Sequence, residues 1–225
     1  MSFLRGIWEI FRKDFLFELE TGETLSLLLV FALSVLFLFN FSFDLSRAEV
    51  QKFFPGFFWL TVLFTSVLGF SKAIEIERRG HAIQGILMTP IPRESIYLGK
   101  VFSSFVFLLL VELILAPLFV VFFGLKMTGA QFLQLLFPLI LGTLGLAAIG
   151  TFMALICQVS PKGWLLFSLG YFPLAVPTLI ASTKLFQGIF QAVGGPAAPW
   201  LRFLGVIDTV ELVVAVLLFE YLMEE

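Results

Sequence analysis

The sequence predicts an all-α integral membrane protein with six transmembrane helices and an N-terminal amphipathic helix at the membrane interface. Hydrophobic residues make up 60% of the 225 residues and charged residues only 13%, so a single soluble core could not bury the apolar surface. The apolar residues also gather in uncharged runs of about 20, the length that a helix needs to cross a bilayer. These two observations exclude an ordinary soluble enzyme or nucleic-acid-binding domain.

The first element, residues 3–18, is predicted to be a helix that lies in the interface plane. Its apolar residues recur at every fourth position, namely Phe3, Ile7, Phe11 and Phe15. Its charged residues take the other side of the helix and are Arg5, Glu9, Arg12 and Lys13. This two-sided pattern is typical of interfacial helices. The alternative is a disordered charged leader; a cleaved signal peptide is not expected, because acidic residues occupy the place of its apolar core.

The six spans follow in order and form a single transmembrane domain over residues 1–225. They are expected at about 24–43, 53–73, 98–123, 131–157, 163–184 and 203–222. The uncharged segment 185–202 is broken by Gly and Pro and carries Trp200 near its end, which favours a place on the outer leaflet.

The distribution of Lys and Arg predicts that both chain ends are cytoplasmic. With the N-terminus inside, nine basic residues fall on the inner side and five on the outer side, which together account for all 14. Short cytoplasmic loops are the ones enriched in Lys and Arg. The segment 74–97 between the second and third spans is then the largest cytoplasmic loop.

This loop is predicted to be a coupling helix that inserts into a groove on a soluble partner. It is charged at one end and apolar at the other, and Ser95 is expected to cap the helix that follows. The alternative is a basic turn that rests on anionic head groups. The candidate residues of the coupling loop are Glu77, Arg78, Arg79, Gly80, His81, Ile83, Gln84, Ile86, Leu87, Met88 and Pro90.

The sequence offers no candidate for catalysis, cofactor binding or metal binding. It has no Gly-rich phosphate loop followed by Lys-Ser/Thr, and no His/Cys/carboxylate cluster at metal-ligand spacing. The single histidine, His81, falls in the cytoplasmic loop, and the single cysteine, Cys157, is expected to pack between helices. Any energy that the chain uses would therefore have to come from elsewhere.

Three carboxylates fall inside predicted spans. Glu112 lies near the middle of the third span, where a charge is expensive, and it could face the bundle interior or a partner subunit. A packing or interface role is favoured over a role in substrate transport. Asp208 and Glu211 lie near the outer end of the sixth span and are expected to reach water.

Several short motifs resemble the CcmB family, the permease subunit of the haem-exporter-type ABC transporter of cytochrome c maturation. They occur in the order and spacing of that family from about residue 50 to 185. They are PGFFWLTVLF (55–64), ILMTPIP (86–92), LILGT (139–143), KGWLL (162–166) and PLAVPTLI (173–180). Two features depart from the family pattern: the run Gly80-His81-Ala82-Ile83-Gln84 replaces Gly-Ser/Thr-Leu-Glu, and Glu112 has no family counterpart.

The resemblance implies an ABC-2 permease of the inner membrane with type V exporter-like architecture. It would act in haem export and haem-chaperone release for c-type cytochromes. The resemblance also implies a cytoplasmic CcmA-like ATPase that uses ATP, a CcmC-like haem-handling subunit, a small CcmD-like subunit and the membrane lipid as partners. A second copy of the chain is a further candidate partner, and no nucleic acid is expected. Haem would be handled by the complex, with its ligands supplied by the partners. The alternatives are an ABC-2 exporter permease for a lipid, glycan or drug, and a membrane scaffold without transport.

Overall fold

The computed structural model describes residues 3–43, 46–80, 91–157, 163–190 and 197–222. Within these ranges the chain forms seven α-helices. They are α1 (Phe3–Thr21), α2 (Glu23–Ser42), α3 (Arg47–Gly80), α5 (Arg93–Phe122), α6 (Gly129–Cys157), α7 (Gly163–Phe190) and α8 (Ala197–Leu222).

Five helices in the described part of the chain are long and apolar enough to cross a membrane, namely α2, α3, α5, α6 and α7. A helix satisfies all its own backbone hydrogen bonds, which lipid cannot do, so apolar runs of this length fold as helices. The last helix, α8, has 26 residues and carries Asp208 and Glu211 within it. The chain is therefore an all-α, multi-pass membrane protein.

Three helices, α3, α5 and α7, extend beyond the spans expected from the apolar runs. α3 continues to Gly80 and α5 begins at Arg93, so both ends of the segment 74–97 are helical. α7 continues to Phe190 instead of stopping near residue 184. An apolar run marks the part of a helix that lies in the bilayer, and the helix itself can continue into the surrounding water.

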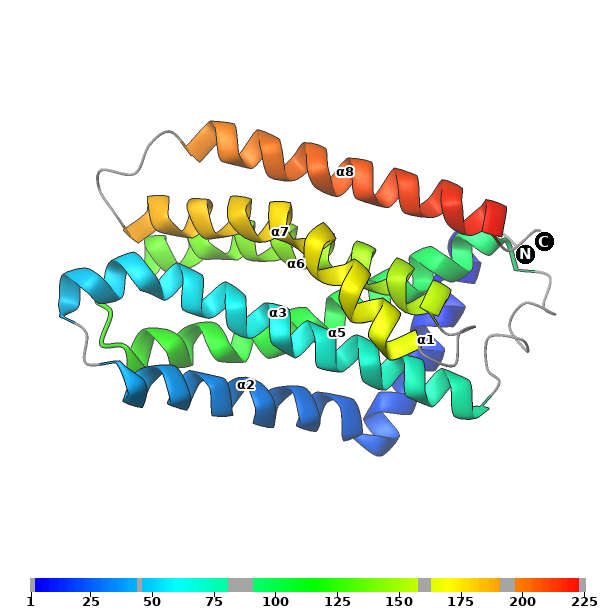
Figure 1. Cartoon of the computed structure of the whole chain (residues 1–225), viewed down its shortest axis with the longest axis horizontal. Helices are drawn as coiled ribbons and strands as arrows, with labels where there is room; N and C mark the ends of the chain where they lie inside the picture. Colours follow the sequence, from blue (N-terminus) through cyan, green and yellow to red (C-terminus); the bar gives the residue numbers. More distant parts are fainter. Residues whose placement is uncertain (1–2, 44–45, 81–90, 158–162, 191–196, 223–225) are drawn as a thin grey trace.

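Helices α2 to α8 run along the bundle, and α1 turns away from α2 and crosses one end of it (Figure 1). The first turn of α1 and the last turn of α8 lie at this same end. α6 lies at the centre of the bundle, because it has the largest buried share of the five candidate spans and contacts α3, α5, α7 and α8.

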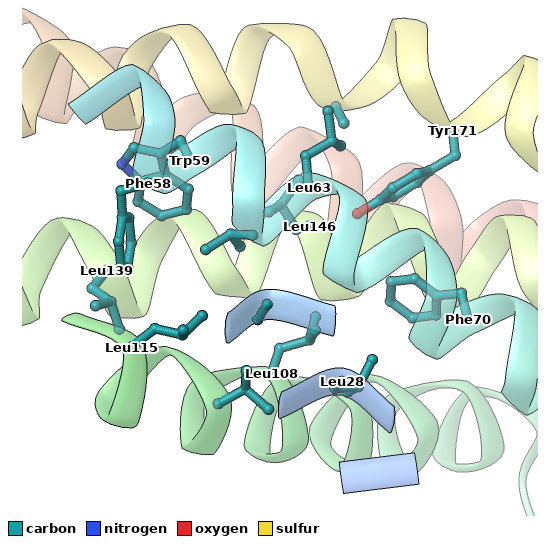
Figure 2. Packing of buried hydrophobic residues seen from close by; sticks show 14 of the residues in the cluster. Leu28, Phe58, Trp59, Leu63, Phe70, Leu108, Leu115, Leu139, Leu146 and Tyr171 are labelled. Carbon is teal, nitrogen blue, oxygen red and sulfur yellow. The ribbon is translucent and has the colours of Figure 1, made fainter. Parts of the chain in front are cut away.

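The main core joins side chains from five helices (Figure 2). Leu28 of α2, Phe58 of α3, Leu115 of α5, Leu139 of α6 and Tyr171 of α7 are all almost fully buried. Many of the core residues are aromatic, and the rings of Phe58 and Phe186 stack with their centroids 5.3 Å apart. Lipid gives no hydrophobic drive between helices, so close van der Waals packing of this kind holds the bundle together.

Glycines let the neighbouring helices approach α6 closely. A Cβ added at Gly150 would collide with the ring of Phe70 in α3, and one added at Gly142 would collide with Trp59 of α3 and Ser182 of α7. Small residues at helix contacts are typical of membrane bundles. The position of α6 at the centre depends on them.

The sharp turn between α1 and α2 is built by two residues. Gly22 has a φ of 60°, the left-handed conformation that glycine adopts without strain. Oε1 of Glu18 accepts a hydrogen bond from the backbone N–H of Leu25 at 2.7 Å, which satisfies one of the free donors in the first turn of α2. The turn directs α1 across the bundle, toward α5.

Candidate functional site

The candidate coupling loop begins at the last turn of α3. Glu77, Arg78, Arg79 and Gly80 end this helix, whereas His81, Ile83, Gln84, Ile86, Leu87, Met88 and Pro90 lie outside the described residues. Glu77 and Arg78 differ in direction. Glu77 is only 8% exposed and points into the protein, while Arg78 is exposed. Of these two neighbours, Arg78 is the one whose charge is available to a partner.

A cluster of charges, which we call the α1 cluster, joins three helices at this end of the bundle. It consists of Lys13 and Asp14 of α1, Glu77 of α3 and Lys100 of α5. Lys100 Nζ forms an ion pair with Glu77 Oε1 and lies 3.3 Å from Asp14 Oδ2. Lys13 Nζ lies 2.9 Å from Asp14 Oδ1. Because the Lys100 side chain is only 11% exposed, its two ion pairs are weakly screened by water and by salt.

Close packing of α1 on α5 places Asp14 within reach of Lys100. The side chain of Ile10 fills the space at Gly99, where an added Cβ would lie 2.7 Å from the Ile10 Cβ. The ring centroids of Phe11 and Phe102 lie 4.7 Å apart. The predicted apolar face of the first helix is therefore directed, at Phe11, toward α5.

Ser95 has a different role from the predicted one. We expected it to cap the helix that follows the coupling loop, but the N-cap of α5 is Pro92. The Ser95 hydroxyl donates instead to the carbonyl of Phe3 at 3.1 Å. The prediction was wrong because a serine near a helix start can bond a chain segment far away in sequence, and Gly6 leaves room for α1 to lie against it.

Glu112 faces the interior of the bundle. It is 1% exposed, and the Thr143 hydroxyl of α6 forms a hydrogen bond with Glu112 Oε2. Within the described residues, its other oxygen has no hydrogen-bond partner. Glu112, which the sequence analysis singled out, therefore forms a buried polar contact between α5 and α6.

The sequence led us to expect that Asp208 and Glu211 reach water, but Asp208 is buried and Glu211 is half-buried. Asp208 is 3% exposed, and neither of its oxygens has a hydrogen-bond partner among the described residues. Glu211 is half-buried, and Thr178 Oγ1 of α7 donates to its Oε1 at 3.3 Å. Both carboxylates flank Gly145 of α6. The expectation failed because distance from the span end does not tell which face of the helix a residue occupies.

The described residues include no group of three or more His, Cys, Asp or Glu side chains that could hold a metal ion. The α1 cluster holds the end of α3 against α1 and α5. The sequence analysis missed Asp14 and Lys100 as members of this site. The only sequence signal was that Lys100 and Glu77 carry opposite charges at the two ends of the predicted loop.

The sequence is similar to that of known proteins over most of its length. The family model described as CcmB protein matches residues 5–221. The chain is 28% identical to heme exporter protein B of Rhodobacter capsulatus over 78% of this chain and 79% of that protein. It is 26% identical to the protein of the same name from Paracoccus denitrificans, over 90% and 91% of the two chains. It is 27% identical to that of Pseudomonas aeruginosa, over 82% and 81%.

Proposed function

The chain belongs to the CcmB family, and from this premise we propose that it is the membrane permease subunit of an ABC transporter acting in haem export for c-type cytochrome biogenesis. The match over residues 5–221 is the observation that carries the proposal, because it covers the bundle, the ends of the coupling loop and α1 together. Its multi-pass helical fold agrees with a transport component.

We further propose six spans, with α8 as the sixth, in an ABC-2 permease of type V exporter-like architecture. α8 is 26 residues long, which exceeds the roughly 20 residues that a span requires. The nine-to-five distribution of Lys and Arg supports cytoplasmic termini, and membership of the CcmB family supports a place in the inner membrane. α1 would then lie at the cytoplasmic interface.

The site of energy coupling is proposed at residues 74–97. A cytoplasmic CcmA-like ATPase would use ATP and bind there, at the exposed Arg78 and the residues that follow it. The α1 cluster would hold the end of α3 against α1 and α5, so that a push on the loop reaches the bundle instead of bending one helix.

The remaining partners are proposed from the family. A CcmC-like subunit would handle haem, a small CcmD-like subunit would complete the complex, and a second copy of the chain would pack beside the first. The only histidine, His81, falls in the proposed coupling loop. The haem ligands would therefore come from the partner subunits.

Reversal of two charges tests the coupling site. We expect Arg78→Glu/Arg79→Glu to reduce co-purification of the ATPase and to abolish cytochrome c maturation, because loss of interface charge pairs commonly costs about 2–5 kcal/mol. The matched control is Arg47→Glu/Lys52→Glu, which makes the same charge change near the opposite end of the same helix. Co-purification is measured by affinity capture of the tagged chain from solubilised membranes.

A double variant that inserts normally and still retains its ATPase at the wild-type level would contradict the coupling site, and the basic turn on lipid head groups would be the better interpretation. Loss of the ATPase only in the control would place the coupling site at the other end of α3, and would reverse the proposed orientation.

A further inference from the structure

A cavity of about 420 Å³ lies between α1, α2, α3, α5 and α6. Its α5 wall extends from Lys100 to Leu108 and its α3 wall from Glu77 to Ser66. At 1.5 Å per residue, these walls are about 12 Å and about 16 Å long. One leaflet of the bilayer core is about 15 Å thick, so the cavity is about as deep as a leaflet.

The lining of the cavity changes from charged to apolar along its depth. The α1 cluster and Glu18 line the end near α1. The deeper walls are mostly apolar and include Leu28, Phe70 and Leu108, which come from three different helices (Figure 2). Hydroxyl groups also line them, from Ser66, Ser103, Ser104 and Thr151. A cavity of this form fits an amphiphile whose polar head is at the membrane surface and whose apolar part lies inside the leaflet.

Among the described residues that line the charged end, there are three carboxylates and two ammonium groups. Lys13 and Lys100 pair with Asp14 and Glu77. Glu18 is 4% exposed and accepts the backbone N–H of Leu25, but no cation in the described part of the chain pairs with it. A buried carboxylate without a cation is costly. The cavity is therefore complementary to a ligand that brings one positive charge near Glu18.

We propose that this cavity binds a phospholipid whose head group carries a primary ammonium and no net charge, namely phosphatidylethanolamine. The ammonium pairs with Glu18, the phosphate lies near Lys13, and one acyl chain fills the apolar part. An anionic lipid or a dicarboxylate such as haem would add negative charge to an end that already has an excess of it. The proposal is independent of the transport function proposed above.

Native mass spectrometry of the full-length chain tests the proposal. The purified protein in detergent is given equal amounts of phosphatidylethanolamine and phosphatidylglycerol with the same acyl chains. We expect the wild type to retain the first lipid in several-fold excess. Glu18→Gln keeps the hydrogen-bond acceptor and removes the charge, so we expect it to retain both lipids equally. Glu20→Gln, at an exposed position of α1, is the matched control and should behave as the wild type.

A second variant tests the apolar part of the cavity. Gly69→Phe places a ring in the cavity beside Leu28 and should abolish lipid retention, whereas Gly205→Phe, with no atom within 4 Å of its added Cβ, should not. The proposal is overturned if the wild type shows no preference, if Glu18→Gln keeps the preference, or if Gly69→Phe is folded and still retains lipid. Displacement of the lipid by added hemin would also overturn it.

Discussion

The α1 cluster and the carboxylates of the bundle interior differ in how the fold accommodates charge. In the α1 cluster, Lys100 contacts both Asp14 and Glu77, and the pairs join three helices. The interior carboxylates are Glu112, Asp208 and Glu211. Among the described residues, Glu112 and Glu211 each bond a threonine hydroxyl, and Asp208 has no hydrogen-bond partner. A paired charge fixes the relative position of helices, whereas an isolated carboxylate in lipid adds cost.

The largest effect is expected from removal of the shared cation. Lys100→Met leaves Asp14 and Glu77 without it, and breaking a buried ion pair in this way typically costs about 3–5 kcal/mol of stability. Unfolding in detergent can be followed by the reaction of a fluorescent thiol reagent with Cys157, the single and buried cysteine.

Two further variants sharpen that result. Lys72→Met removes an ion pair to Glu23, whose side chain is 64% exposed, and should cost about 0–1 kcal/mol. Lys100→Met/Glu77→Gln should recover part of the loss. Equal effects of Lys100→Met and Lys72→Met would remove the distinction between the α1 cluster and an ordinary surface pair.

A smaller effect is expected from a single methyl group beside the interior carboxylates. A Cβ at Gly145 would collide with Asp208 Oδ1 and lie 2.9 Å from Thr178 Cγ2. Gly145→Ala should therefore destabilise the bundle by about 1–3 kcal/mol, the usual cost of overpacking. Gly205→Ala, with open space around its Cβ, should be neutral or slightly stabilising in the same thiol-reaction assay. Equal stability of the Gly145→Ala and Gly205→Ala variants would contradict close packing of α6 against α8 at Gly145.

The smallest effect is expected at Glu112. Glu112→Gln keeps the shape of the side chain, and its amide can donate to Thr143 Oγ1, which leaves the Thr143 proton for the Leu139 carbonyl 2.6 Å away. Stability should change by less than about 1 kcal/mol, and assembly and cytochrome c formation should remain close to wild type. Loss of cytochrome c formation with normal assembly would show that Glu112 acts in the mechanism and is not only a packing residue.

The sequence predicted the helical elements well and their mutual contacts poorly. Apolar runs indicate where a helix crosses lipid, and a period of four residues indicates that α1 has an apolar face. Neither pattern shows that Lys100 meets Asp14, because those residues are 86 positions apart. The burial of Asp208 was missed for a related reason, since it depends on a glycine in α6 that leaves room for the carboxylate.

The packing of α1 on α5 sets an order of events during biosynthesis. Asp14 precedes Lys100 by 86 residues, and a ribosome adds about 5–20 residues per second, so α1 is made roughly 4 to 17 s before the helix it packs against. During that interval Ile10 and Phe11 have no α5 to cover them. An amphipathic helix can lie on the lipid surface in the meantime. The α1 cluster and the wall of the cavity can be complete only after α5 has been made.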